Sequence, residues 1–170
     1  MTRQLKTLAL ALAGALAAGA ALGATSLSRT DSDALQSMAQ ANMAEVEAGQ
    51  MALKKAQDPK VKQFAQMMVD DHSAGLKDVQ HVAQSKGVTL PTEPNKGQKS
   101  QADTLSKLEG ASFDRQYMEK AGVSDHTKDH DELRTISKNA KDTDVKNLAA
   151  KMLPVVDRHL AEAKRMAGGK

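Results

Sequence analysis

Four side chains with metal-binding chemistry lie on or beside the apolar faces of predicted helices. With about 100° of rotation per residue, His72 and His159 fall inside apolar stripes, and His126 falls beside one. Glu45 falls among small residues on one face of the first predicted helix in the chain. Three imidazoles and one carboxylate suit zinc, copper or nickel better than magnesium or calcium, and iron is also a candidate.

The four residues lie at similar heights along their helices. Glu45 and His72 are almost equally far from the turn at Asp58, so at ~1.5 Å per residue they reach the same level. His126 and His159 lie within about one turn of each other on either side of their own turn. Helical bundles build metal sites from facing helices in this way. We therefore predict a mononuclear metal site formed by Glu45, His72, His126 and His159.

A metal-free polar network is the alternative interpretation of the same four residues. Buried polar groups must be satisfied, and Glu45 and the imidazoles are able to satisfy one another by hydrogen bonds. In either case Asp71 is a candidate for orienting a neighbouring histidine.

The apolar patterns predict an all-α, antiparallel four-helix bundle. The predicted helices span residues 32–57, 59–87, 112–139 and 142–166. Thr30 with Asp33, or Asp31, is expected to cap the first helix, and Asp58 with Pro59 the second. A long connection joins the second and third helices, and its predicted short helix, residues 100–109, is capped by Ser100 and Asp103 and closed by Gly110.

The first residues have the pattern of a secretory signal peptide. Arg3 and Lys6 precede the apolar run 8–22, which is shorter than the ~20 residues of a membrane span. Cleavage candidates are Ala20, Gly23 and Ala24, of which Ala24 is favoured. We expect a signal peptide over 1–24 and one domain over 25–170, with an uncleaved anchor as the alternative. The predicted location is the periplasm, with no transmembrane span after cleavage.

The composition of the chain limits the classes of partner that we expect. The chain has no cysteine, so its fold cannot depend on disulfides. Two of the three formal net positive charges belong to Arg3 and Lys6, which leaves the expected domain close to neutral. Only three aromatic residues occur, and there is no basic block, so nucleic acid is not an expected partner.

Five segments resemble a known family. They read MAEVEAGQMAL, VKQFAQMMVDDH, GVTLP, LEGASFDRQYMEKAGVSDH and LPVVDRHL. In order and spacing, over roughly residues 31–166, the chain resembles the ferritin-like domain of unknown function 4142. The resemblance implies a ferritin-like four-helix bundle in an exported bacterial protein, associated with the outer membrane. The family motif positions are Glu45, His72, Tyr117, His126 and His159. The activity of the family is unknown.

Two classes of function remain open at this point. One is a non-enzymatic metal-binding protein of the envelope, and the other is a helical module that binds an envelope protein. A redox enzyme ranks lowest, because ferritin-like di-iron sites need Glu-x-x-His pairs. In this chain Val69, Val123 and Val156 stand three residues before the core histidines.

Overall fold

The computed structural model describes residues 27–168, and every regular element in that range is helical. The elements are α1 (Arg29–Lys55), α2 (Pro59–Ser85), α3 (Lys96–Ser106), α4 (Gly110–Tyr117), the π-helical segment η1 (Met118–Asp125), α5 (His126–Asn139) and α6 (Thr143–Gly168). The all-α prediction is therefore confirmed over the described range. The predicted signal peptide, 1–24, lies outside it. None of the helices in this range is long and apolar enough to cross a membrane.

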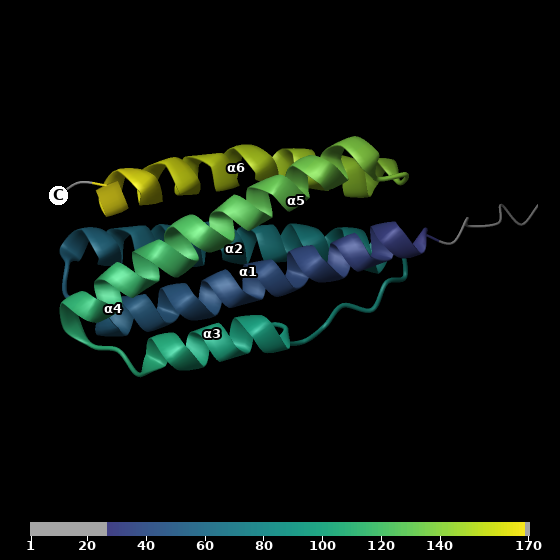
Figure 1. The fold of residues 1–170 in the computed structure, drawn as a ribbon. Coiled ribbons are helices and arrows are strands. Elements are labelled where there is room, and N and C mark those ends of the chain that lie inside the picture. The colour runs from purple at the N-terminus through teal and green to yellow at the C-terminus, as the bar shows by residue number, and fades with distance from the viewer. Residues whose placement is uncertain (1–26, 169–170) are drawn as a thin grey trace, which may run out of the picture.

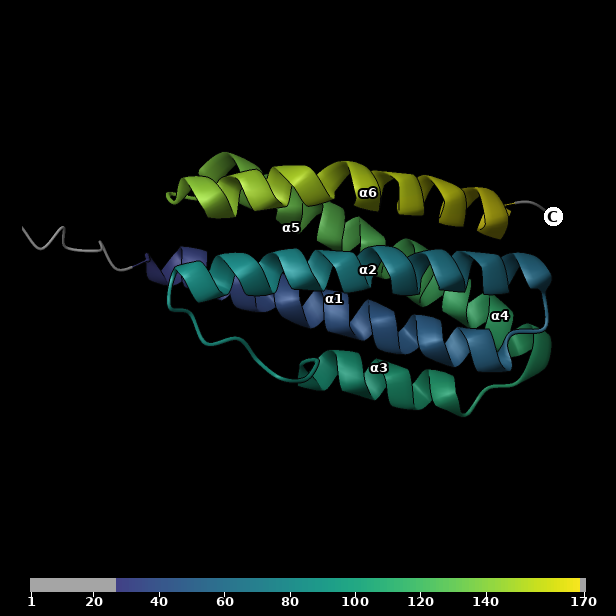
Figure 2. The ribbon, with the colours of Figure 1, turned by 180° about the vertical axis from the view of Figure 1, so that it is seen from behind.

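The long helices lie side by side. α2 folds back along α1, while α4, η1 and α5 form one continuous helical run that crosses the α1–α2 pair (Figure 1). α6 packs on α5 and α2, and α3 lies against α1 on the side away from α6 in both views (Figure 2). This establishes an all-α arrangement with a long α2–α4 connection, whereas the ferritin-like assignment stays a prediction.

Buried aspartates tie the turns to neighbouring helices. Ser28, rather than the predicted Thr30 or Asp33, caps α1 by accepting from the Asp31 N–H at 3.1 Å. The Asp31 carboxylate instead accepts from the backbone N–H groups of Lys141 and Asp142, at 3.1 and 3.0 Å. Asp31 therefore fixes the α5–α6 turn against the start of α1.

The α1–α2 turn is also held by a buried aspartate from another helix. Asp58 caps α2 by accepting from the Lys60 N–H at 2.8 Å, and Pro59 occupies the first turn, as predicted. Asp114 on α4 accepts from the backbone N–H groups of Gln57 and Asp58. Each long-helix turn is thus held by an acid from another helix.

The short helix of the connection begins earlier than predicted. Asn95 and Gln98 form a reciprocal capping box, with bonds of 3.0 and 2.8 Å, so α3 starts at Lys96 instead of Ser100. Gly110 has a φ of +62° and opens α4 rather than closing the short helix. The sequence pattern thus located a helix here but placed it about four residues too late.

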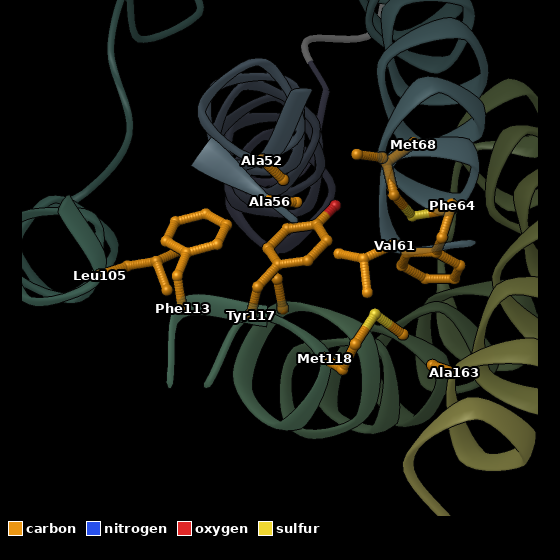
Figure 3. Packing of buried hydrophobic residues seen from close by; sticks show 12 residues of the cluster. Ala52, Ala56, Val61, Phe64, Met68, Leu105, Phe113, Tyr117, Met118 and Ala163 are labelled. Atoms are coloured by element: carbon orange, nitrogen blue, oxygen red, sulfur yellow. The ribbon is translucent and has the colours of Figure 1, made fainter. Parts of the chain in front are cut away.

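The apolar core has two clusters separated by a polar layer. The aromatic cluster consists of Ala52, Ala56, Val61, Phe64, Ala65, Met68, Leu105, Phe113, Tyr117, Met118, Ala121 and Ala163. Figure 3 shows this cluster, in which the Phe113 and Tyr117 rings stack at 6.1 Å. The aliphatic cluster consists of Leu35, Met38, Ala39, Val79, Ala83, Leu133, Ala140, Val145, Leu148, Ala149 and Val156. Between them along the helices are the buried polar residues Asn42, Glu45, His72, His126 and His159.

Candidate metal centre

Three of the four predicted residues meet in this polar layer. His72 Nε2 lies 3.3 Å from His126 Nε2, which in turn lies 3.3 Å from His159 Nδ1. One ring nitrogen from each histidine falls within 4.8 Å of the others, and all three residues are buried. We call these three residues the histidine triad and the converging atoms its inner nitrogens.

The outer nitrogen of His72 is held by Asn42. The Asn42 side-chain amide donates to the Met38 carbonyl at 2.7 Å, which turns its Oδ1 towards His72. Oδ1 lies 3.1 Å from His72 Nδ1, and an oxygen there can only accept. The proton of neutral His72 is therefore on Nδ1, and its inner Nε2 carries a lone pair.

Gly75 makes room for Asn42. A Cβ added at Gly75 would lie 2.5 Å from Asn42 Oδ1, a contact that forces the amide to move. Gly75 is one turn after His72 on α2, so the glycine leaves the space that the orienting amide occupies. Neither Asn42 nor Gly75 was singled out from the sequence, although an asparagine among alanines on a buried helix face is a visible signal.

His159 is oriented by Asp71, as expected for this aspartate. The Asp71 carboxylate lies 2.8 Å from His159 Nε2 and 2.6 Å from Arg158 Nη2. A carboxylate holds the proton of the ring on the nitrogen that faces it, so the inner Nδ1 is the free one. This is the carboxylate–histidine pair that commonly supports a metal ligand.

His126 is oriented by backbone. Its Nδ1 donates to the Ala121 carbonyl at 2.7 Å, within η1, so its proton also lies on the outer side. The prediction of a regular α-helix over 112–139 was wrong here, because the π-helical segment changes the rotation per residue before His126. His126 is consequently fully buried, whereas regular helical steps placed it beside the apolar line.

Three inward lone pairs cannot satisfy one another. A hydrogen bond between two inner nitrogens needs a proton on one of them, and all three outer acceptors hold the protons elsewhere. Burial lowers the pKa of each histidine, that of His126 to about 4, and neighbouring imidazoles lower the His72 pKa further. At neutral pH the triad therefore presents three lone pairs to one point with no proton between them.

Glu45 is buried as predicted but is not on the inner side of the triad. Its Oε1 lies 3.8 Å from the outer nitrogen of His126, whose proton is donated to the Ala121 carbonyl. Burial, then Asp129 and Asp125, raise the Glu45 pKa well above its ordinary range. The structure thus brings His72, His126 and His159 together, and places Glu45 behind His126.

A cavity of about 220 Å³ between α2 and α6 reaches one member of the triad, His72. The residues that line it include His72, Met152, Asp71 and Gly75. An ion pair of 2.8 Å between Lys151 and Asp78 lies at its exposed rim. This cavity gives an ion a path to His72 from the surface.

The chain belongs to a family of undetermined function. A family model described as Domain of unknown function (DUF4142) matches residues 16–166. This confirms the resemblance drawn from the five sequence segments. No curated protein matches the chain.

Similar solved structures share the fold. A DUF305 fragment from Deinococcus radiodurans superposes with a TM-score of 0.73 at 14% identity, covering 84% of this chain and 97% of the fragment. CopM in the Cu(I)-bound form superposes with a TM-score of 0.67 at 16% identity, covering 81% of this chain and 95% of CopM. The Cu(II)-bound form of CopM gives 0.68 at 17% identity with the same coverage.

Proposed function

We propose that this protein binds one transition-metal ion at the histidine triad and acts by binding rather than by catalysis. The observation that carries the proposal is the set of three inward lone pairs, each fixed by an acceptor on the far side of its ring. A bound cation removes the repulsion between these lone pairs, and burial disfavours the proton as that cation. His72, His126 and His159 would hold the metal through nitrogen.

Copper is the first candidate among the metals. Imidazole nitrogen suits copper and zinc, and copper has the higher affinity for a given nitrogen site. The solved structures of CopM with Cu(I) and Cu(II) support copper, since that protein shares the fold. Met152 lines the same cavity as His72, and its soft thioether is a ligand that suits Cu(I).

The proposed setting is the bacterial envelope. Residues 1–24 have the signal-peptide pattern, and a cysteine-free chain needs no disulfide chemistry after export. A buried site with fixed ligands suits sequestration of a metal in the periplasm. Cell fractionation with sequencing of the mature N-terminus tests this location, and an intact Met1 in the cytoplasm would contradict it.

The test of metal binding is a titration of metal-free, untagged protein. Cu(I), Cu(II), Zn(II) and Fe(II) are added against a competing chromogenic chelator, for wild type and for the double variant His72→Ala with His159→Ala. His81→Ala is the matched control, because His81 is an exposed histidine on α2. We expect the double variant to lose at least about two orders of magnitude in copper affinity, while the control binds like wild type.

Two results would overturn the proposal. One is wild-type binding no tighter than that of the double variant for any of the metals, which would favour the interaction module. The other is a melting temperature that chelator does not change in protein as purified. A bound metal at 100 times its Kd adds about 2.7 kcal/mol to the free energy of unfolding, so its removal is visible, whereas a metal-free polar network gives no such change.

A further inference from the structure

A second cavity, of about 390 Å³, lies between α1, α3, η1 and α5. Five acidic residues and one lysine line it. The acids are Glu45, Glu47, Asp125, Asp129 and Glu132, and the lysine is Lys128. α3 covers this cavity, and the Gln101 amide on α3 donates to Asp125 on its wall. This cavity shares no lining residue with the one between α2 and α6.

Glu45 lines this cavity and carries a buried carboxylate oxygen. Glu45 is 4% exposed, and its Oε2 makes no hydrogen bond within residues 27–168. Its Oε1 faces His126 Nδ1 at 3.8 Å, but that N–H is donated to the Ala121 carbonyl. Burying an ionised carboxylate without a partner is costly, so a cation on the cavity side would stabilise the ionised form of Glu45.

The chemistry of the walls indicates a hard cation. Carboxylate oxygens suit magnesium, calcium and manganese, whereas the imidazoles of the triad suit copper and zinc. Within residues 27–168, only the histidine triad brings three ligand atoms within 4.8 Å of one another. The carboxylates are therefore farther apart, and an ion among them keeps part of its water shell.

We propose that this cavity is a second cation site, which takes a hydrated divalent cation of the magnesium, calcium and manganese class. Glu45 is the inner ligand, and Asp125 on η1 and Asp129 on α5 line the same cavity. The site is independent of the metal proposed for the triad: it uses oxygen ligands, and it lies on the opposite side of the His126 ring.

The chain carries its own reporter for this site. Tyr117 is the only tyrosine and there is no tryptophan. Its buried hydroxyl has no partner and is close enough to Glu45 that the carboxylate contributes to raising the Tyr117 pKa. Terbium(III), a hard ion that prefers oxygen ligands, emits on excitation of a tyrosine only when it binds near the ring. Tyrosine-sensitised emission therefore reports binding at this cavity and not at distant surface acids.

The experiment titrates terbium(III) into wild type, Glu45→Gln, Asp129→Asn and the control Glu119→Gln, which alters an exposed acid on η1 outside this cavity. We expect saturable emission that manganese or calcium displaces, at least about 10-fold weaker terbium binding in Glu45→Gln and Asp129→Asn, and wild-type binding in the control. Far-UV circular dichroism verifies that each variant is folded.

The outcome is separable from that of the histidine site. The double variant His72→Ala with His159→Ala is expected to keep the sensitised emission, whatever its copper affinity. Absence of sensitised emission in wild type, or equal emission in Glu45→Gln and wild type, would overturn the second site and leave Glu45 as a protonated core residue.

Discussion

The two sides of the His126 ring differ in how completely their polar atoms are satisfied. On the nitrogen side, each histidine has its outer N–H held at 2.7–3.1 Å by Asn42, Ala121 or Asp71. On the oxygen side, Glu45 has an unpartnered carboxylate oxygen next to a cavity of about 390 Å³. Fixed imidazole nitrogens with little space would select an ion by geometry and softness, whereas acids spread around a cavity would select by charge.

Met68→Asp places a carboxylate in the apolar core, for comparison with the Glu45 carboxylate, which lies beside a cavity. Met68 is fully buried in the aromatic cluster, with apolar neighbours in place of a cavity. We expect this variant to lose about 3–5 kcal/mol of unfolding free energy, because it buries a charge with no partner. Urea denaturation measures the loss, and Gln63→Asp, at an exposed position on α2, is the control. A Met68→Asp variant as stable as the control would show that this helix face is not core.

Gly75→Ala tests the fixed geometry of the nitrogen side. The added Cβ would lie 2.5 Å from Asn42 Oδ1, so the amide must leave the position from which it orients His72. Loss of an orienting partner typically costs about 10- to 100-fold in metal affinity, and we expect that range for copper. Gly168→Ala, with open space around the new methyl group, is the control. Unchanged affinity in Gly75→Ala would mean that Asn42 does not set the tautomer of His72.

Helical periodicity found the core faces because a regular α-helix has a fixed rotation per residue. His72 was placed correctly inside the apolar stripe of α2, among the buried residues Val61, Met68 and Val79. The same step failed along η1, where it put His126 beside the apolar line, whereas His126 is fully buried. A π-helical segment has no residue signature that would have revealed this change of step.

The orienting contacts of the site were only partly predictable. Asp71 was recognisable because it precedes His72 and is charged, yet its partner is His159 on another helix. Asn42 and the Ala121 carbonyl depend on how α1 and η1 pack around the rings, which spacing along one helix does not determine. Sequence therefore located the three histidines, and tertiary packing determined which nitrogen of each ring faces inward.

Asp129→Asn tests the oxygen side through pH. Burial, then Asp125 and Glu132, raise the Asp129 pKa from 3.8 to about 7. The folded state therefore binds this proton more tightly than the unfolded state, and stability falls as pH rises between these values. We expect the metal-free variant to melt with wild type near pH 4 and to gain on the order of 1 kcal/mol above about pH 7, a gain that solvent screening limits. Calorimetry over this range measures the difference, and a constant offset at all pH values would contradict it.

The histidine triad has the opposite pH dependence over the same range. The His126 pKa is lowered from 6.5 to about 4, so the folded state resists this proton and stability falls as pH drops between these values. Wild type therefore combines opposing slopes, and Glu45, whose pKa is also raised, adds to the slope of Asp129, so the double variant Glu45→Gln with Asp129→Asn isolates the histidine slope. A double variant whose stability no longer changes between about pH 4 and 6.5 would show that the triad is not desolvated.

Tyr117→Phe has the smallest expected effect and addresses the second unpartnered atom of the oxygen side. The Tyr117 ring is fully buried against Phe113, while its hydroxyl makes no hydrogen bond. Removing a hydroxyl without a partner keeps the packing and relieves desolvation, so we expect a change within about 0.5 kcal/mol, in the stabilising direction. Tyr117→Leu, which also removes the ring, is expected to cost several times more and separates packing from the hydroxyl.

Chemical denaturation in the presence and absence of manganese tests whether the Tyr117 hydroxyl takes part in binding the cation. A loss above about 1 kcal/mol in Tyr117→Phe that appears only with manganese would show that the hydroxyl contacts the water shell of the bound ion. The same loss without manganese would mean that a cation is not what satisfies this side of the core.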